Sequence, residues 1–368
     1  MEEISSLVTA YGLRGLQAEE INILKLNAEA SNGSIDAVFN MAICYRDGIK
    51  VVQDLKKSFD LLKQLSDIGC DKDALYLVAQ YYGFGYGVEQ DLDEYGRLLK
   101  KYVDNYGETL EDDDDVYYWA IQLEDSDIQK AIDMYTQLAE NDHMNAKARL
   151  GYLYFENETI RNYTKAFEWT LEAANDGHRQ AQRNLGCFYQ DGKGVSKDDA
   201  KAAYWFEKAA EQGHDDAQNH LGVLYYNGKG VEQDYQKACY WFEKAAEQGN
   251  ADAQNNLGSL YQDGKGVEQD YQKACYWFEK AAEQKHLIAM NCLSLLYIQG
   301  QGIPQDLEKG LKLAECAMER GSADASINLA MVYLLKHEDE KAKMYLKKGV
   351  EQGSASAQVM LQKINSLL

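Results

Sequence analysis

The chain contains a 36-residue internal repeat, and this repeat constrains the fold more than any other feature. Residues 215–250 and 251–286 agree at 29 of 36 positions. The period continues in both directions, because a small residue recurs in each unit at spacings of 31 to 41 residues. A period of this length is typical of a solenoid, in which every unit stacks on the next. The nine small anchor residues are Ala42, Ala79, Ala120, Gly151, Gly186, Gly222, Gly258, Ser294 and Ala330.

Each unit has the pattern of two amphipathic helices. In residues 215–227, apolar residues fall at i, i+4, i+7 and i+8, which is one helical stripe. Residues 234–248 carry a second stripe that includes Trp241 and Phe242, and we expect both rings to fill the space between units. One unit cannot bury both stripes, so stacking supplies the core.

The loop between the two predicted helices is also periodic. A Gly-Lys-Gly recurs in it, but neither the strand nor the remaining motif of a phosphate-binding loop is present, so the glycines indicate turn geometry. An aliphatic residue follows nine positions after the anchor and is predicted to enter the core, and an aspartate three positions later is predicted to cap the second helix. These pairs are Val51 and Asp54, Val88 and Asp91, Val195 and Asp198, Val231 and Asp234, Val267 and Asp270, and Ile303 and Asp306.

The combined pattern, A-x-x-x-L-G-x-x-Y-x-x-G-x-G-V-x-x-D-x-x-K-A-x-x-W-x-x-x-A-A, resembles the Sel1-like repeat, a relative of the tetratricopeptide repeat. The match is close in residues 178–321 and looser in residues 34–177 and 322–362. The resemblance implies an all-α solenoid, a right-handed superhelix of about nine helix-turn-helix repeats whose first helices line the concave side. It also implies an adaptor-like protein without a cofactor.

We predict four segments along the chain. N-terminal capping helices occupy residues 1–33, and divergent repeats with an acidic insertion near 108–115 occupy residues 34–177. Regular 36-residue repeats follow in residues 178–321, and the last repeat with a C-terminal capping helix occupies residues 322–368.

The charge of the chain narrows its partners. Sixty acidic and 38 basic residues give a formal net charge of −22, which repels nucleic acid and anionic lipid and favours a basic protein partner. No apolar stretch is long enough to span a membrane, and the acidic N-terminus is unlike a signal peptide, so we expect a cytoplasmic protein that is a monomer rather than a homo-oligomer. The seven dispersed cysteines include no CxxC, so we expect free thiols and no zinc site.

One part of the chain is much more acidic than the rest. Residues 91–127 hold 13 acidic and three basic residues, and Glu111 is followed by four aspartates. The segment lacks the glycine and the ligand spacing of a calcium loop. A solvated loop and a contact surface for a Lys/Arg-rich partner both remain open, and a metal site is the least favoured interpretation. The candidate residues here are Asp112, Asp113, Asp114 and Asp115.

The two nearly identical repeats indicate a second candidate surface. Four of their seven differences fall in or at the end of the first helix, on the face opposite its core stripe. A recognition surface would vary in this way, but so would any exposed face under neutral drift, and superhelical twist would bury some of these positions against the next unit. Across the repeats, the candidates are Arg149, Tyr152, Phe155, His220, Val223, Tyr226, Leu295 and Ile298.

These patterns favour a non-catalytic protein-binding module, such as an adaptor, scaffold or inhibitor, that holds a basic protein in a concave groove. An immunity-type protein that neutralises one toxin is a sharper alternative. An enzyme or enzyme subunit with a site assembled across repeats is the alternative of another class. The six histidines form no closely spaced cluster and no nucleophile–base pair in sequence, which disfavours catalysis.

Overall fold

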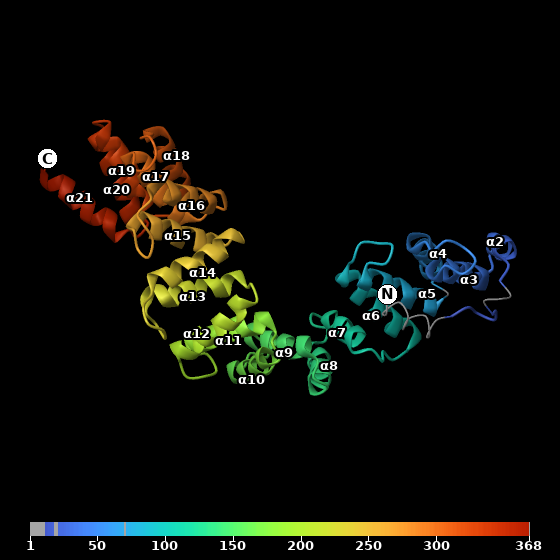
Figure 1. Cartoon of the computed structure of the whole chain (residues 1–368). Coiled ribbons are helices and arrows are strands. Elements are labelled where there is room, and N and C mark those ends of the chain that lie inside the picture. The colour runs from blue at the N-terminus through green and yellow to red at the C-terminus, as the bar shows by residue number, and fades with distance from the viewer. Residues whose placement is uncertain (1–11, 18–20, 70, 368) are drawn as a thin grey trace. The chain divides into compact units, whose positions relative to one another are not determined.

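The computed structural model describes residues 12–17, 21–69 and 71–367, and the regular elements in these ranges are all helices (Figure 1). The expected capping helices in residues 1–33 lie partly outside the described residues, and so does Cys70. Consecutive helices contact one another from α2 to α8 and from α10 to α21, as expected for an α-solenoid. The helices are α2 (Ile23–Ser31), α3 (Ile35–Asp47), α4 (Leu55–Ile68), α5 (Lys72–Phe84), α6 (Leu92–Tyr106), α7 (Asp113–Ile121), α8 (Ile128–Glu140), α9 (Met144–Glu156), α10 (Tyr163–Asn175), α11 (Arg179–Asp191), α12 (Asp199–Glu211), α13 (Asp215–Asn227), α14 (Tyr235–Glu247), α15 (Ala251–Asp263), α16 (Tyr271–Glu283), α17 (Leu287–Gln299), α18 (Leu307–Glu319), α19 (Ala325–Leu335), α20 (Asp339–Glu351) and α21 (Ala355–Leu367).

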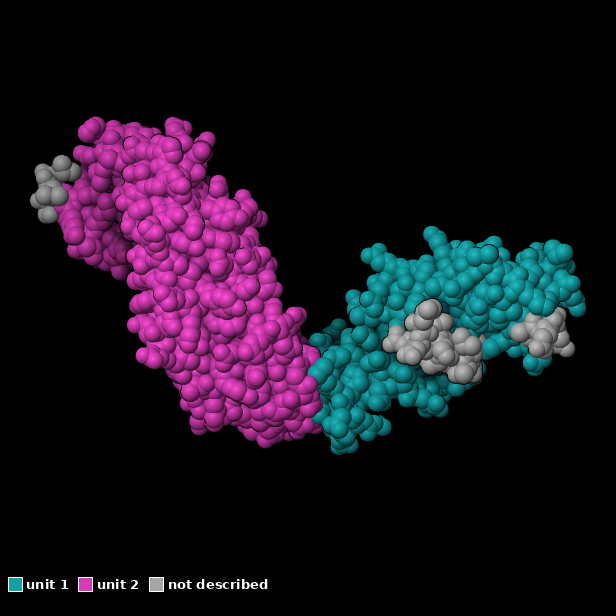
Figure 2. Space-filling model, viewed as in Figure 1, with its two compact units in different colours: residues 1–150 teal, residues 151–368 magenta. Residues whose placement is uncertain are grey.

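The chain forms two compact units, which Figure 2 shows in different colours. Unit 1 comprises residues 1–150 and contains the divergent repeats. Unit 2 comprises residues 151–368 and contains the regular repeats. The odd-numbered helices from α3 to α19 are the first helices of their pairs, and the even-numbered helices from α4 to α20 are the second helices.

Aspartate caps begin the second helices. Asp234 accepts hydrogen bonds from the backbone N–H groups of Gln236 and Lys237, both at 3.0 Å, which satisfies donors that have no partner within the helix. All six predicted capping aspartates occupy this position and accept such a bond, so the prediction is confirmed: Asp54, Asp91, Asp198, Asp234, Asp270 and Asp306. The aliphatic residues of these loops are half-buried, and four of them pack against hydrophobic clusters: Val51, Val88, Val267 and Ile303.

The second glycine of each Gly-x-Gly loop allows a close approach of two backbones. Gly230 has φ +70°, and a Cβ atom at this position would lie 2.1 Å from the backbone oxygen of Asp199, at the start of the preceding second helix. Gly266 makes the same approach to Tyr235 one repeat later. Only glycine combines this backbone conformation with this contact, so the loop has a structural role.

The small anchor residues make room for buried phenylalanine rings. A Cβ atom at Gly222 would lie 2.6 Å from the ring of Phe242, which is 2% exposed. Trp277 of the next repeat packs against the cluster around Phe242, as expected for a ring between units. Its equivalent Trp241 is half-buried. It follows Tyr240 on the helix surface, where the two rings meet edge to face at 5.0 Å. The next residue along the helix points about 100° away, so only Phe242 faces the anchor.

Candidate functional site

The first helices of unit 2 lie side by side and are joined by polar contacts between repeats. The side-chain amide of Asn256 on α15 donates to Asn219 on α13 at 3.1 Å. The amide of Asn328 on α19 donates to the backbone oxygen of Asn291 on α17 at 2.9 Å. These helices therefore present one continuous face within unit 2.

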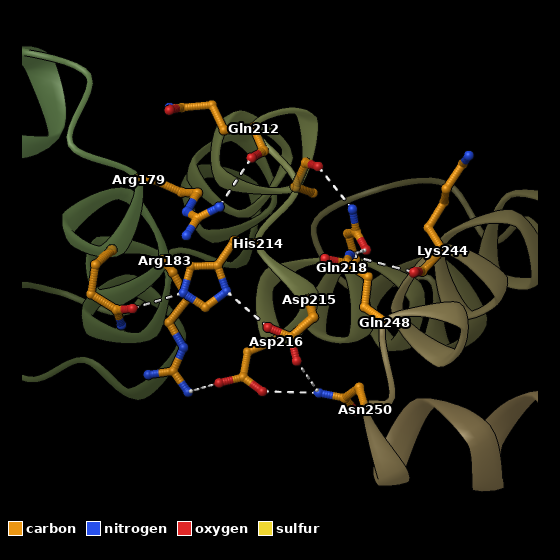
Figure 3. A network of polar contacts seen from close by, with 12 residues as sticks. Arg179, Arg183, Gln212, His214, Asp215, Asp216, Gln218, Lys244, Gln248 and Asn250 are labelled. Carbon is orange, nitrogen blue, oxygen red and sulfur yellow. Dashed lines mark hydrogen bonds and ion pairs between the residues drawn. The ribbon is translucent and has the colours of Figure 1, made fainter. Parts of the chain in front are cut away.

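A polar network at the ends of α11, α13 and α15 shows how the repeats are connected (Figure 3). Arg183 lies 3.4 Å from a carboxylate oxygen of Asp216. The side-chain amide of Asn250 donates to the other oxygen of Asp216 at 3.0 Å and to Asp215 at 3.1 Å. Asp216 thus contacts the repeat before it and the repeat after it.

Buried glutamines form a second set of connections in unit 2. Gln218, which is 4% exposed, donates to the backbone oxygen of Ala210 at 3.1 Å and accepts from Gln248 at 2.8 Å (Figure 3). The same contacts recur one repeat earlier and one repeat later, between Gln182 and Gln212 and between Gln254 and Gln284. These amides satisfy buried polar groups and are not available to a partner.

One carboxylate recurs at the beginning of several first helices. In unit 2, Asp216 and Asp252 each accept a bond from the residue that begins the next first helix, yet their side chains remain 47% and 71% exposed. The series therefore keeps accessible negative charge along the first helices. The aspartates that share this position six residues before the anchor are Asp36, Asp73, Asp114, Asp216, Asp252 and Asp324.

Three candidates on α13 are half-buried rather than freely exposed. The His220 ring stacks on Phe206 of α12, with 4.8 Å between centroids and 4° between planes, and this burial lowers the pKa of His220. Val223 packs on the hydrophobic cluster around Phe242. The Tyr226 hydroxyl accepts from Lys265 at 2.9 Å. All three retain some exposure, but packing accounts for part of each side chain.

The candidates on α9 differ among themselves. Arg149 pairs with Glu124, with 2.7 Å between Nε and Oε1, and this ion pair raises the pKa of Arg149 above its ordinary value. Tyr152 is 48% exposed, which makes it the most open aromatic candidate. Phe155 packs edge to face on Phe188 at 5.3 Å and is half-buried.

The two candidates on α17 have different surroundings. Leu295 is half-buried. Ile298 is 1% exposed, so its prediction as an exposed anchor was wrong. The reason is on α18, where Gly310 has no side chain and a Cβ atom there would lie 2.7 Å from Cγ1 of Ile298. Ile298 fills the space that this glycine leaves.

The acidic segment of unit 1 is the beginning of helix α7 rather than a loop. Asp112 is the N-cap residue and accepts from the backbone N–H of Asp114 at 2.9 Å. Asp113 and Asp114 are exposed in the first turn, where negative charge is favourable. Asp114 also lies 3.1 Å from the ring of His143.

Asp115 is the exception, and its prediction as an exposed contact was wrong. It is 1% exposed and accepts hydrogen bonds from Tyr76 at 2.5 Å, from Gln80 at 2.9 Å and from Tyr95. Burial raises the pKa of Asp115, and these three donors partly oppose that shift. The carboxylate connects α7 to α5 and α6. Asp115 lies three residues after the cap, and at this helical position its side chain points inward. The side chains of Asp112, Asp113 and Asp114 face solvent.

The histidines and cysteines have structural surroundings. His178 and His286 accept backbone N–H bonds at 3.1 and 3.2 Å as N-caps, and His214 occupies the same position without such a bond. In the described ranges, no group of three or more His, Cys, Asp or Glu side chains is arranged to hold a metal ion. Nor do these ranges contain a helix with the length and apolarity needed to cross a membrane. The six cysteines outside position 70 are free: Cys44, Cys187, Cys239, Cys275, Cys292 and Cys316.

Sequence reasoning missed one cluster in unit 1. Arg14 lies against the first helices α3 and α5, where it contacts Phe39, Asn40, Asp71 and Asp73. A signal was present in the sequence, because an asparagine recurs two residues before the anchor in several repeats. These residues are Asn40, Asn184, Asn256 and Asn328.

The helix pairs and their contacts define an α-solenoid of the Sel1 type, and comparison with known proteins agrees. The Sel1 repeat profile matches residues 35–70, 72–94, 122–143, 145–178, 179–214, 215–250, 251–286, 287–322 and 323–354. The chain belongs to the Sel1 repeat family, whose members generally mediate protein–protein interactions.

Solved structures of similar proteins include c5321, described as a protective antigen of uropathogenic Escherichia coli with an SLR fold. This chain is 28% identical to it with a TM-score of 0.72, over 93% of this chain and 74% of that protein. A Sel1 repeat protein from Oxalobacter formigenes is 31% identical with a TM-score of 0.55, over 64% of this chain and 99% of that protein. Immunity protein Pa5087 from Pseudomonas aeruginosa is 20% identical over 60% of this chain and 85% of that protein, and its TM-score of 0.35 is too low for a functional inference.

Proposed function

We propose that this chain is a non-catalytic adaptor, scaffold or inhibitor that binds a basic protein along its first helices. The observation that carries the proposal is the series of aspartates six residues before the anchor, which recurs in both units. The side chains of Asp36, Asp216 and Asp252 are 72%, 47% and 71% exposed. Together with the net charge of −22, they favour association with a basic surface.

Partly exposed aromatic rings on the first helices support recognition as well as attraction. Tyr152 is 48% exposed, and His220 and Tyr226 keep part of their rings accessible. Partly buried aromatic rings are typical anchors in interfaces, because they lose little conformational entropy on binding. The exposed Asp113 and Asp114 of unit 1 would assist the first encounter. An enzymatic role is less well supported, because His178 and His286 accept backbone N–H bonds as helix caps.

A finer version of this function is neutralisation of one basic toxin, in the manner of an immunity protein. The acidic first helices would suit it equally well. The two roles differ in the consequence of binding, since an inhibitor abolishes the partner's activity, whereas an adaptor leaves it intact.

The test compares two sets of variants that remove equal charge. Affinity capture at low and high salt identifies the partner, and surface plasmon resonance measures its association and dissociation rates. We expect Asp216→Asn with Asp252→Asn to slow association and to reduce its salt dependence. The matched control is Glu243→Gln with Glu279→Gln, which removes two exposed charges from second helices. If the control weakens binding and the first-helix variant does not, the proposed face is wrong.

A further inference from the structure

A short segment of the chain lies across two first helices of unit 1 as a bound peptide would. The backbone N–H of Arg14 donates to Oδ1 of Asn40 at 2.7 Å, and Nδ2 of Asn40 donates back to the backbone oxygen of Arg14 at 3.1 Å. Asn40 lies on α3 and is 2% exposed. A single buried amide therefore holds both main-chain groups of Arg14, whatever its side chain is, and the chain bends at Arg14 and Gly15.

The guanidinium of Arg14 is bound by carboxylates and an aromatic ring. Its two terminal nitrogens lie 2.7 and 2.9 Å from the two oxygens of Asp71, and one of them lies 2.6 Å from Asp73. The guanidinium carbon lies 3.8 Å from the centre of the Phe39 ring. This planar, bidentate geometry selects arginine over lysine. We call Phe39, Asn40, Asp71 and Asp73 the arginine site.

The arginine site needs a cation. The side chain of Asp71 is 3% exposed. Burial alone would raise the pKa of Asp71, but hydrogen bonds from Arg14 and from the backbone N–H of Ala74 outweigh it and hold the pKa below its ordinary value. A buried carboxylate that lost its partner would be strongly unfavourable. Whatever replaces Arg14 must therefore bring a positive charge of the same shape.

Apolar residues on both sides of Arg14 complete the bound segment. Leu13 packs against the hydrophobic clusters that contain Phe39 and Met41. Leu16 packs against the second of these clusters. The segment thus presents leucine, arginine, glycine and leucine to a surface formed by first helices, and the glycine has φ +65°.

We propose that the arginine site is a peptide-binding site for a short, arginine-containing segment of the partner, and that residues 12–17 occupy it in the free protein. The proposal rests on the proposed function, since it names the chemistry of the basic segment that the first helices of unit 1 recognise. All groups of the site belong to α3, α5 and the N-cap of α5. A partner arginine replaces Arg14 one for one, so Asp71 keeps its cation throughout the exchange.

Charge and geometry favour a partner peptide over a nucleic acid or a small cation. The carboxylates repel phosphate, and Asn40 pairs with an N–H donor and a carbonyl acceptor of one residue, which every peptide backbone offers and a small cation does not. In unit 2, Asn256 and Asn328 occupy the position of Asn40 but bond to neighbouring first helices. Asn184, at the same position, accepts from Gln180 and Arg183 of its own helix. Arginine recognition is therefore specific to unit 1.

Peptide binding to the full-length chain tests the proposal directly. The probe is a fluorescent, amidated peptide with the sequence of residues 12–17, GLRGLQ, and its control carries citrulline in place of arginine, which keeps the shape and removes the charge. Fluorescence anisotropy is measured with the wild-type chain, with Arg14→Ala, with Arg14→Lys and with Arg14→Ala combined with Asn40→Ala. Circular dichroism confirms that each variant is folded.

We expect Arg14→Ala to bind the arginine peptide. The wild type should bind it with an affinity at least about tenfold lower, because the native segment occupies the site most of the time. The citrulline peptide and the double variant should show no binding. Arg14→Lys, which keeps a charge for Asp71, should bind more tightly than the wild type. If neither Arg14 variant binds the arginine peptide better than the citrulline peptide, residues 12–17 are a structural cap and the proposal is wrong. The assay contains no native partner, so this outcome leaves the proposed function on the first helices of unit 2 intact.

Discussion

The two units use the same helix pair but stabilise it differently. In unit 2, one set of contacts recurs with the period of the sequence, since Phe206, Phe242 and Phe278 each pack over an anchor glycine and are no more than 2% exposed. In unit 1, buried polar contacts occur once each, as Arg14 with Asp71 and Tyr95 with Asp115. The regular repeats thus reuse equivalent apolar and polar contacts, whereas unit 1 adds buried polar contacts that occur once to its apolar core.

This difference has a consequence for function. A periodic core leaves the first helices free to vary, and the two nearly identical repeats differ at His220, Val223 and Tyr226 while their loops and second helices match. A set of unique polar contacts instead creates local sites with their own chemistry. The arginine site is one of them.

The largest expected effect is the loss of a repeated core residue. Phe242→Ala removes a ring that fills the space over Gly222, and we expect it to lower the free energy of unfolding by roughly 3–5 kcal/mol. Damage in a linear array spreads mainly to neighbouring repeats, so hydrogen exchange should accelerate in residues 215–290.

Two controls lie on the same helix. Tyr240→Ala, at a side chain that is 52% exposed, should change stability by less than about 0.5 kcal/mol. Trp241→Ala should fall between the two, because Trp241 is half-buried. Equal losses for all three variants would show that the core assignment is mistaken.

A smaller but more local effect is expected for the buried carboxylate of unit 1. Asp115→Ala leaves Tyr76, Gln80 and Tyr95 without their acceptor, which should cost about 1–3 kcal/mol. Hydrogen exchange should accelerate in α5, α6 and α7. The control Asp113→Asn changes an exposed neighbour and should have little effect on unfolding. Unchanged exchange in Asp115→Ala would contradict the view that unit 1 depends on unique polar contacts.

The smallest expected effect concerns pH in unit 2. Burial against Phe206 lowers the pKa of His220, so the unfolded chain binds a proton near its ordinary pKa of about 6.5 while the folded chain does not. His220 therefore does not reduce the free energy of unfolding above that pH, and it reduces this free energy as the pH falls through it. The His220→Asn variant copies Asn256 of the next repeat. Its thermal unfolding temperature should rise relative to that of the wild type as the pH is lowered from 7 to 5. The exposed His337→Asn serves as the control. A constant difference across this range would refute the assignment.

The sequence alone determined the repeat, the helix pairs and the positions that local chemistry dictates. A loop aspartate can cap only the helix that follows it, so Asp234 could be assigned from spacing. A turn with positive φ in close contact with another backbone requires glycine, so Gly230 could be assigned in the same way. The family resemblance followed from the same residues. Each of these features depends on neighbours within one repeat or on its fixed period.

Only the tertiary structure decided which side chains remain accessible. Ile298 and Asp115 have the helical positions of exposed residues, yet Gly310 leaves space for one and three donors from two other helices surround the other. The contact of Arg14 with Asp71 joins residues 57 positions apart. No local pattern encodes such a contact, because it depends on how a short segment crosses two helices after they have packed. A one-dimensional pattern does not contain that packing.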